Sequence, residues 1–152
     1  MLKKLQISLV LFVSLFVLDQ YLKGLFVNGF YLEGDCISLV LAYNKGVAFS
    51  MFAFLAENLK YIQIAIMLGG IIYLLLNKDI FMDYYLPTAL LLAGGVSNIY
   101  DRFIHEGVVD YVYWHCGFDF AIFNLADVLI DISILLILFI SFQNDKKSTA
   151  KK

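Results

Sequence analysis

Residues 120–142 read FAIFNLADVLIDISILLILFISF, an apolar run long enough to cross a lipid bilayer as one helix. Three polar residues interrupt its first half, namely Asn124, Asp127 and Asp131. Their spacing of i, i+3 and i+7 puts them on one face of a helix. Because ionisable groups are costly at membrane depth and usually functional there, we expect this face to point into a helix bundle or a wet cavity, away from lipid.

The whole chain has the composition of an integral membrane protein. Of its 152 residues, 62% are hydrophobic and 16% are charged, and the mean hydropathy is +0.83. Soluble domains carry about 25% charged residues. The length and the single proline favour one membrane-embedded domain over residues 1–152. The net charge of −2 excludes a basic nucleic-acid-binding protein.

Four segments have the length and apolarity of membrane-spanning helices. We expect them at about residues 5–26, 58–76, 84–103 and 120–142, which predicts an all-α membrane protein. Pro87 falls in the first turn of the third segment, where proline is tolerated. The N-terminal segment imitates a secretory signal peptide, but no small-x-small cleavage motif follows it, so we interpret it as a retained first span.

The lysines indicate how these spans are oriented. Cytoplasmic segments are enriched in Lys and Arg, so both termini are predicted to be cytoplasmic, as is a short loop at residues 78–83. The loops at about 27–57 and 104–119 then face outward. Six of the eleven basic residues lie near the two ends of the chain: Lys3, Lys4, Lys146, Lys147, Lys151 and Lys152.

The first outer loop carries two short apolar runs, Ile37–Tyr43 and Val47–Phe52, on either side of Asn44-Lys45-Gly46. Such runs around an Asn-x-Gly turn predict a β-hairpin that rests on the membrane surface or covers a site. Cys36 and Cys116 both fall in the outer loops, where a disulfide is chemically allowed. The sequence leaves their pairing open.

Further polar groups lie at the outer ends of the other spans. Asp19 and Lys23 are spaced i, i+4, which favours an ion pair at a helix end, with a supporting role at a site as the alternative. Asn98, Asp101 and Arg102 share one helix face. Arg102 can pair with Asp101 or donate to a peptide carbonyl, and a purely structural ion pair stays open.

Asp110 lies in an apolar stretch with strand character that runs from Gly107 to Tyr113. An extended segment there can deliver the carboxylate to the membrane surface, although an isolated loop aspartate is usually only solvated. Two carboxylates brought together support acid–base chemistry of the aspartic-protease kind. His105 and His115 lack metal-ligand spacing, and the sequence contains no Gly-rich phosphate-binding loop, so we expect neither a metal nor another cofactor.

Five short blocks carry these polar residues in a fixed order. They are Asp19-Gln20-x-x-Lys23, Asn44-x-Gly46-x-Ala48-Phe49-Ser50, Gly94-Gly95-x-x-Asn98-x-x-Asp101-Arg102, Gly107-Val108-Val109-Asp110 and Phe123-Asn124-x-Ala126-Asp127. Together they resemble the lipoprotein signal peptidase family, also called type II signal peptidases, over most of the chain. Leu22 stands where the family more often has Ser or Thr, and Asp131 is not part of the family's pattern.

The resemblance implies four transmembrane helices with a small extracytoplasmic β-cradle from the first outer loop. It implies an aspartic endopeptidase that needs no metal or nucleotide. The substrate would be a bacterial prolipoprotein that already carries diacylglycerol, cleaved just before its lipidated lipobox cysteine to release the signal peptide. The protein would then lie in the bacterial inner membrane, with its active site at the outer, periplasmic face. We expect a monomer in contact with membrane lipid.

By position, the resemblance implies that Asp110 and Asp127 form the catalytic dyad. A second set of residues would bind substrate or support the dyad. This set comprises Asn44, Gly46, Asn98, Arg102, Asn124, Asp19, Lys23 and Asp101.

Two other classes of function compete with this interpretation. A small proton-coupled transporter would use Asp127 and Asp131 as part of a relay, since intramembrane acids often conduct protons. A relay should cross the whole bilayer, yet residues 132–140 beyond Asp131 offer one serine and no charge, and beyond its first turn the second span offers only Gln63. A non-catalytic membrane scaffold would need no aspartate pair at all.

Overall fold

The computed structural model describes residues 1–46, 55–105 and 107–149 of the chain. Four long helices dominate the described part, and each is long and apolar enough to cross a membrane. They are α1 (Leu2–Val27), α2 (Ala56–Leu76), α3 (Lys78–Ile104) and α4 (Leu125–Thr149). The predicted all-α membrane fold with four spans is therefore confirmed.

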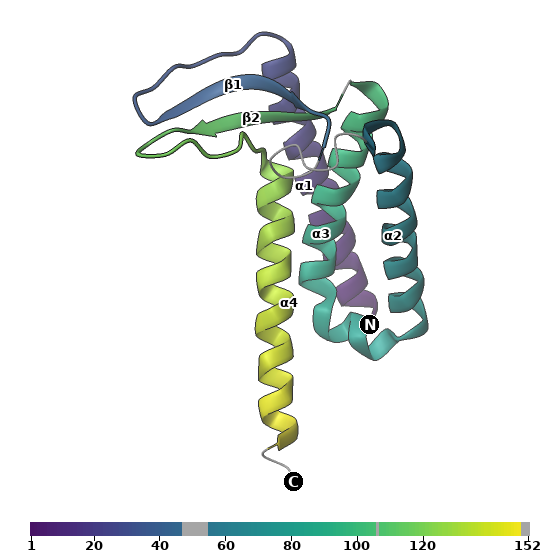
Figure 1. Ribbon diagram of the computed structural model, residues 1–152. Helices are drawn as coiled ribbons and strands as arrows, with labels where there is room; N and C mark the ends of the chain where they lie inside the picture. Colours follow the sequence, from purple (N-terminus) through teal and green to yellow (C-terminus); the bar gives the residue numbers. More distant parts are fainter. Residues whose placement is uncertain (47–54, 106, 150–152) are drawn as a thin grey trace.

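Helix α3 is the centre of the bundle, because it packs against each of the other three helices (Figure 1). Small residues allow this close packing. Ala93 and Ser97 are fully buried, and a Cβ atom added to Gly94 would collide with the backbone carbonyl oxygen of Ala126 in α4. The C-terminal half of α3 is thus held tightly against the first turn of α4.

The connection between α2 and α3 differs from the expected loop at residues 78–83. Only Asn77 separates the two helices, and Lys78 already begins α3. The backbone leaves helical geometry at Tyr84, where α3 kinks, three residues before Pro87. Proline has no N–H and its ring crowds the preceding turn, which accounts for a kink at this point. The predicted loop is therefore a short helical segment ahead of the membrane span.

The two strands, β1 (Ile37–Asn44) and β2 (Val108–Trp114), form a small antiparallel sheet. The pairing runs from Ile37 opposite Trp114 to Asn44 opposite Val108, with a bulge between Leu39 and Ala42. This sheet confirms the small β-element of the predicted fold. The run Val47–Phe52, expected to complete a hairpin with β1, lies outside the described residues, and the partner that β1 does show comes from the second outer loop.

The sheet lies across one end of the helix bundle, and the start of α1 and the end of α4 lie at the other end (Figure 1). Helix α4 begins at Leu125 and not at Phe120 as expected. The reason is that Phe123 forms an antiparallel bridge with Val112, so the chain is still extended beside β2 just before the helix starts. This bridge brings the first turn of α4 next to the strand that carries Asp110.

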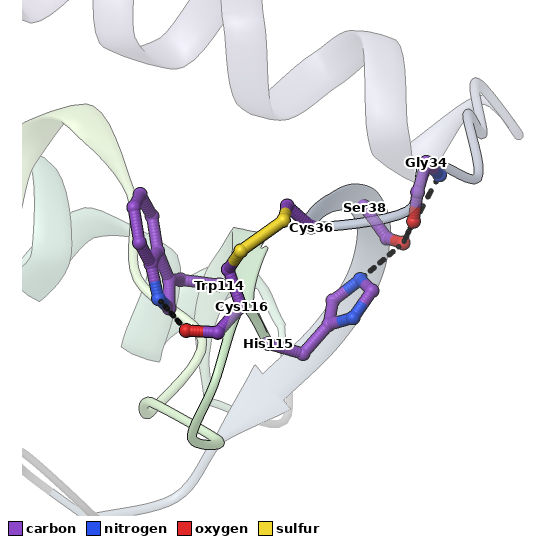
Figure 2. Close-up of a disulfide and its surroundings, with 6 residues drawn as sticks. All are labelled: Gly34, Cys36, Ser38, Trp114, His115 and Cys116. Carbon is purple, nitrogen blue, oxygen red and sulfur yellow. Dashed lines mark hydrogen bonds between the residues drawn. A yellow bond between two sulfur atoms is a disulfide. The ribbon is translucent and has the colours of Figure 1, made fainter.

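A disulfide joins Cys36 to Cys116, whose Cα atoms are 4.4 Å apart, which resolves the pairing that the sequence left open. Figure 2 shows the bond beside the end of the sheet, together with a contact of 2.9 Å between Ser38 Oγ and His115 Nε2. Cys36 precedes Ile37, and Cys116 closely follows Trp114, the strand partner of Ile37. The disulfide therefore ties the open end of the two-stranded sheet.

We expect the double substitution Cys36→Ser and Cys116→Ser to lower the melting temperature of the protein in detergent. The bond closes a sequence separation of 80 residues. For a fully unfolded chain a loop of this size corresponds to more than about 4 kcal/mol, but helices that stay in the detergent micelle already restrict the chain, so a loss of about 2 kcal/mol is expected. Thermal unfolding with and without reductant measures it, and an unchanged melting temperature in both would contradict the prediction.

Candidate active site

Asp110 is an almost fully buried carboxylate on β2, with 2% of its surface exposed. Ala42 lies opposite it across the sheet, and Asn44 points to the same face two residues further along β1. The Nδ2 atom of Asn44 donates a hydrogen bond of 3.1 Å to Asp110 Oδ2. Gly107 allows this approach, because a Cβ there would collide with the carbonyl oxygen of Asn44.

Asp127 lies in the first turn of α4, directly after the sheet. Its Oδ2 atom accepts a hydrogen bond of 3.1 Å from the backbone N–H of Asn124, and Asn124 Oδ1 accepts one of 2.9 Å from the backbone N–H of Asp127. This reciprocal pair is a capping box, which satisfies two N–H groups at the helix start. The helix terminus thus fixes the position of the Asp127 carboxylate.

Asn124 connects the two aspartates. While its oxygen caps α4, its Nδ2 atom donates a hydrogen bond of 2.6 Å to Asp110 Oδ1. The fully buried side chain of Asn124 therefore contacts both the carboxylate of Asp110 and the backbone of Asp127. The structure brings Asp110 and Asp127, from the second outer loop and the fourth span, into one site.

A buried chain of contacts from α1 orients the Asn98 amide. Lys23, which is 2% exposed, donates to Asn98 Oδ1 at 2.8 Å. Because Lys23 can only donate, the amide oxygen of Asn98 must face Lys23 and its Nδ2 group must point the other way. Asn98 Nδ2 donates a hydrogen bond of 2.9 Å to Asp127 Oδ1. A cation on the first span thus directs an amide on the third span towards a carboxylate on the fourth.

Asp19 and Asp101 hold the Lys23 ammonium group in place. Lys23 Nζ lies 2.8 Å from Asp19 Oδ2 and 2.7 Å from Asp101 Oδ2, and both carboxylates are fully buried. Asp19 also accepts a hydrogen bond from the backbone N–H of Ala126, and Asp101 accepts one from the backbone N–H of Val109. The predicted Asp19–Lys23 ion pair is present. The two carboxylates that hold Lys23 also bind the backbone next to Asp127 and Asp110.

Arg102 donates to the backbone carbonyl oxygens of Lys45 and Gly46. Of the two roles expected for this side chain, the structure shows contact with peptide carbonyls, whereas the cation paired with Asp101 is Lys23. Gly46 also donates its N–H to Asn44 Oδ1 at 3.0 Å. The guanidinium group therefore binds the segment just after β1 to the C-terminal end of α3.

The surroundings of Asp110 favour its protonated form. Burial raises the pKa of Asp110 to about 7, and the nearby Asp127 carboxylate adds to this, while hydrogen bonds from Asn44 and Asn124 and the Lys23 charge oppose it. Arg102 is a further cation in the neighbourhood. A carboxyl group with a pKa near neutral is suited to giving and taking protons at physiological pH.

Three site residues were not assigned a role from the sequence. Gln20 donates to Asp101 Oδ1 at 2.8 Å, and Ser97 donates to Asp19 Oδ2. Tyr111 stacks on an aromatic ring of α1 and accepts the backbone N–H of Leu125 with its hydroxyl group. Gln20 and Ser97 were present within or beside the recognised blocks, but their partners come from other helices, which helical spacing alone does not reveal.

Asp131 differs from the expectation that it faces the bundle or a wet cavity. Its side chain is exposed on the outside of the bundle. The inner face of α4 is defined instead by Ala126, which packs on α3, and by Ser133, which donates to the carbonyl oxygen of Pro87 at 2.7 Å. Asp131 is two residues from Ser133, so it points roughly away from α3. This position does not support a relay from Asp127 through Asp131.

An apolar groove of about 510 Å³ lies between α2, α3 and α4 and reaches Asn98. Its walls include Met67, Gly95, Ile130 and Asn98, and Asn98 is the residue that donates to Asp127. The groove is thus continuous with the candidate site. Within the three described stretches, no three His, Cys, Asp or Glu side chains are placed to hold a metal ion.

Comparisons with known proteins match this arrangement along most of the chain. A family model described as signal peptidase (SPase) II matches residues 11–143. The lipoprotein signal peptidase of Sulfurimonas denitrificans is 54% identical over 142 residues, which are 93% of this chain and 91% of the relative. That of Wolinella succinogenes is 55% identical over 139 residues, covering 91% of this chain and 95% of the relative.

A likeness to a solved structure extends the comparison to the fold. A structure described as a bacterial membrane enzyme has a TM-score of 0.81 with this chain at 23% identity, and the match covers 93% of this chain and 91% of that one.

Proposed function

The chain belongs to the signal peptidase II family, and we propose that it is an aspartic endopeptidase that removes the signal peptide from diacylglyceryl-modified prolipoproteins. Asp110 and Asp127 form the catalytic dyad. Asn44, Gly46, Asn98, Arg102 and Asn124, with Asp19, Lys23 and Asp101, bind substrate or support the dyad. Residues 1–152 act as one membrane-embedded domain.

The observation that carries the proposal is the pair of carboxylates joined through Asn124. Hydrolysis of a peptide bond needs a base to activate water and an acid to protonate the carbonyl oxygen. Two close carboxylates do not both ionise easily, so they share one proton and supply both functions. In this mechanism the ionised member takes a proton from water while the protonated member donates to the carbonyl oxygen. The pair titrates as a unit, so neither aspartate is the permanent acid.

The groove supports a substrate that stays in the bilayer. Its apolar walls on α2, α3 and α4 suit the apolar segment of a signal peptide, and Asn98 marks the point at which the groove meets the dyad. The diacylglyceryl chains stay in the lipid while the bond before the modified cysteine reaches the two carboxylates. Cleavage then requires no withdrawal of the lipid anchor from the membrane.

The disulfide supports an active site on the extracytoplasmic side of the membrane. Disulfides persist in oxidising compartments such as the bacterial periplasm. Cys36 precedes β1, Cys116 follows β2 and Asp110 lies on β2, so all three are at the sheet. The start of α1 and the end of α4 lie at the opposite end of the bundle (Figure 1). We therefore place the sheet and the dyad at the periplasmic face and both termini in the cytoplasm. We expect the enzyme to act as a monomer.

The purified protein in detergent tests the proposal directly. Two synthetic prolipoprotein substrates of identical sequence are compared, one with the diacylglyceryl group on its lipobox cysteine and one without. We expect cleavage of the first, just before the modified cysteine, identified by mass spectrometry of both products. If folded protein cleaves neither substrate, or cleaves at another bond, the proposed function is wrong.

The pH dependence of cleavage provides a second test. Because the pKa of Asp110 is raised to about 7, the dyad keeps its shared proton below that pH and loses it above, so the rate should fall as pH rises through about 7. Substituting Asn44→Ala removes a hydrogen bond that lowers this pKa. The alkaline limb of the pH–rate profile should then move to higher pH.

The exposed residue Asn28 provides a control for this pH prediction. Asn28→Ala removes an amide that contacts only the end of α1 among the described contacts, so the limb should stay in place. If the alkaline limb of the pH–rate profile stays in place in Asn44→Ala, or moves to lower pH, Asn44 does not lower the pKa of Asp110 as predicted.

A further inference from the structure

Gln63 is a polar residue in the membrane span α2, and it lines the apolar groove. Its Oε1 atom is buried and has no hydrogen-bond partner in the structure. An unpaired polar atom in such surroundings costs roughly 1–3 kcal/mol. The proposed mechanism makes no use of this group, so its unmet acceptor points to a ligand that supplies a donor.

The packing of α2 on α3 places Gln63 at the level of the dyad. The methyl group of Met67 lies against Gly95. The tight connection at Asn77 makes the two helices antiparallel. Gln63 lies one turn before Met67 on α2, and Asn98 lies about one turn after Gly95 on α3. Because the helices are antiparallel, both steps lead in the same direction, so Gln63 and Asn98 are at a similar level. Both amides line the same groove, and Asn98 is bonded to Asp127.

The chemistry of the substrate limits what Gln63 Oε1 can accept. The ester groups of a diacylglyceryl modification offer acceptors and no donors. A helical signal segment uses its backbone N–H groups internally. Only where the segment becomes extended, as it must for the dyad to reach a peptide bond, does it present free N–H groups within the groove.

We propose that Gln63 is a positioning residue that accepts a backbone N–H of the substrate on the signal-peptide side of the scissile bond, where the signal helix ends. The proposal rests on the function proposed above and adds a residue outside the five recognised blocks. By satisfying an N–H that unwinding exposes, Gln63 favours the extended form of the substrate beside the dyad. The bond forms only in the complex, which explains why the acceptor is unpaired in the free protein.

The substitution Gln63→Met keeps the length of the side chain and removes the acceptor. In the free protein it removes a buried unpaired group, so the melting temperature should stay the same or rise. In the complex it leaves a substrate N–H unpaired, so kcat/KM should fall about tenfold. Gln143→Met, the same change at an exposed position near the cytoplasmic end of α4, should alter neither quantity.

A backbone-ester scan of the substrate identifies the N–H. Diacylglyceryl prolipoprotein peptides are made in which one amide at a time, on the signal-peptide side of the scissile bond, is replaced by an ester. At one position the ester should lower kcat/KM of the wild type by about the same factor as Gln63→Met does. With Gln63→Met that ester should cause no further loss, because the partner is already missing.

Three results would overturn the proposal. The first is a kcat/KM of Gln63→Met equal to that of the wild type, which would show that Gln63 does not position the substrate. The second is that every ester lowers kcat/KM by the same factor in the wild type and in Gln63→Met, because the losses are then independent of Gln63. If the wild type does not cleave the unmodified-backbone lipopeptide, the proposed function fails and this inference fails with it. That result is distinct, because it appears before any variant is compared.

Discussion

Replacing Asp127 by asparagine should lower the rate of lipopeptide cleavage by about 10³-fold, within the range that acid–base catalysis contributes. Asparagine has nearly the same shape but neither takes nor gives a proton at neutral pH. The substitution also removes the negative charge that helps to raise the pKa of Asp110. The remaining carboxyl group then ionises more easily and has no partner with which to share a proton.

The protein should still fold with Asp127→Asn. The new side chain keeps one oxygen, which can accept either from Asn98 or from the backbone N–H of Asn124, so one of the two present contacts is kept. The ion pairs of Lys23 lie on the other side of Asn98 and are not touched. Single-turnover cleavage and thermal unfolding, measured on the same detergent preparation, separate a loss of chemistry from a loss of structure.

Asp131→Asn is the matched control for this variant. It is the same chemical change one helical turn away on α4, at a side chain that is exposed outside the bundle. Its cleavage rate should equal that of the wild type. If Asp127→Asn cleaves normally while Asp131→Asn does not, the dyad is wrongly assigned, and a function based on Asp131, such as proton transport, must be tested.

Helical spacing explains why much of the site could be predicted before the structure. Asp19 and Lys23, four residues apart, had to share a face, and so did Asn98 and Asp101. Asn124 and Asp127 have the spacing of a capping box, which is a local interaction. These relations depend on the geometry of one helix. In the structure Asp19 pairs with Lys23, and Asn124 and Asp127 are bonded to each other. Asn98 and Asp101 both contact the Lys23 ammonium group.

Contacts between separate elements were beyond this kind of reasoning. Nothing local in β1 indicates that its described partner is β2, from the second outer loop. Arg102 follows Asp101 in the chain, yet side chains of consecutive helical residues diverge, and Lys23 from α1 takes the place beside Asp101. The blocks taken from the family resemblance predicted which residues form the candidate site but not the partner of each.

Two side chains on the spans show most clearly what the sequence could not predict, namely which side chains are buried. The polar spacing of Asn124, Asp127 and Asp131 predicted a common buried face. The sheet contacts the start of α4, through Asn124 and Leu125, whereas Asp131 further along is exposed. Gln63 was noted only as a lone polar residue. Its unpaired buried oxygen became visible when α2 packed beside α3, because burial is a property of the assembled bundle.

The substitution Lys23→Met should have the largest effect on stability, a loss of about 3–5 kcal/mol in the free energy of unfolding. Methionine fills a similar volume but leaves the buried carboxylates of Asp19 and Asp101 without their cation. Removing one partner of a buried ion pair is costly because the other charge stays in a medium of low polarity. Thermal unfolding in detergent should show a large drop in melting temperature, and Lys3→Met, at an exposed position in the same helix, should show none.

A second substitution distinguishes this electrostatic cause from a simple loss of packing. Adding Asp101→Asn to Lys23→Met removes one of the two uncompensated charges, so the double variant should be more stable than the sum of the two single losses predicts. Cleavage should remain low in both variants, because Asn98 loses the bond from Lys23 that directs its amide towards Asp127. Additive losses of stability would contradict the charge argument, and full activity in Lys23→Met would show that Asn98 is oriented without it.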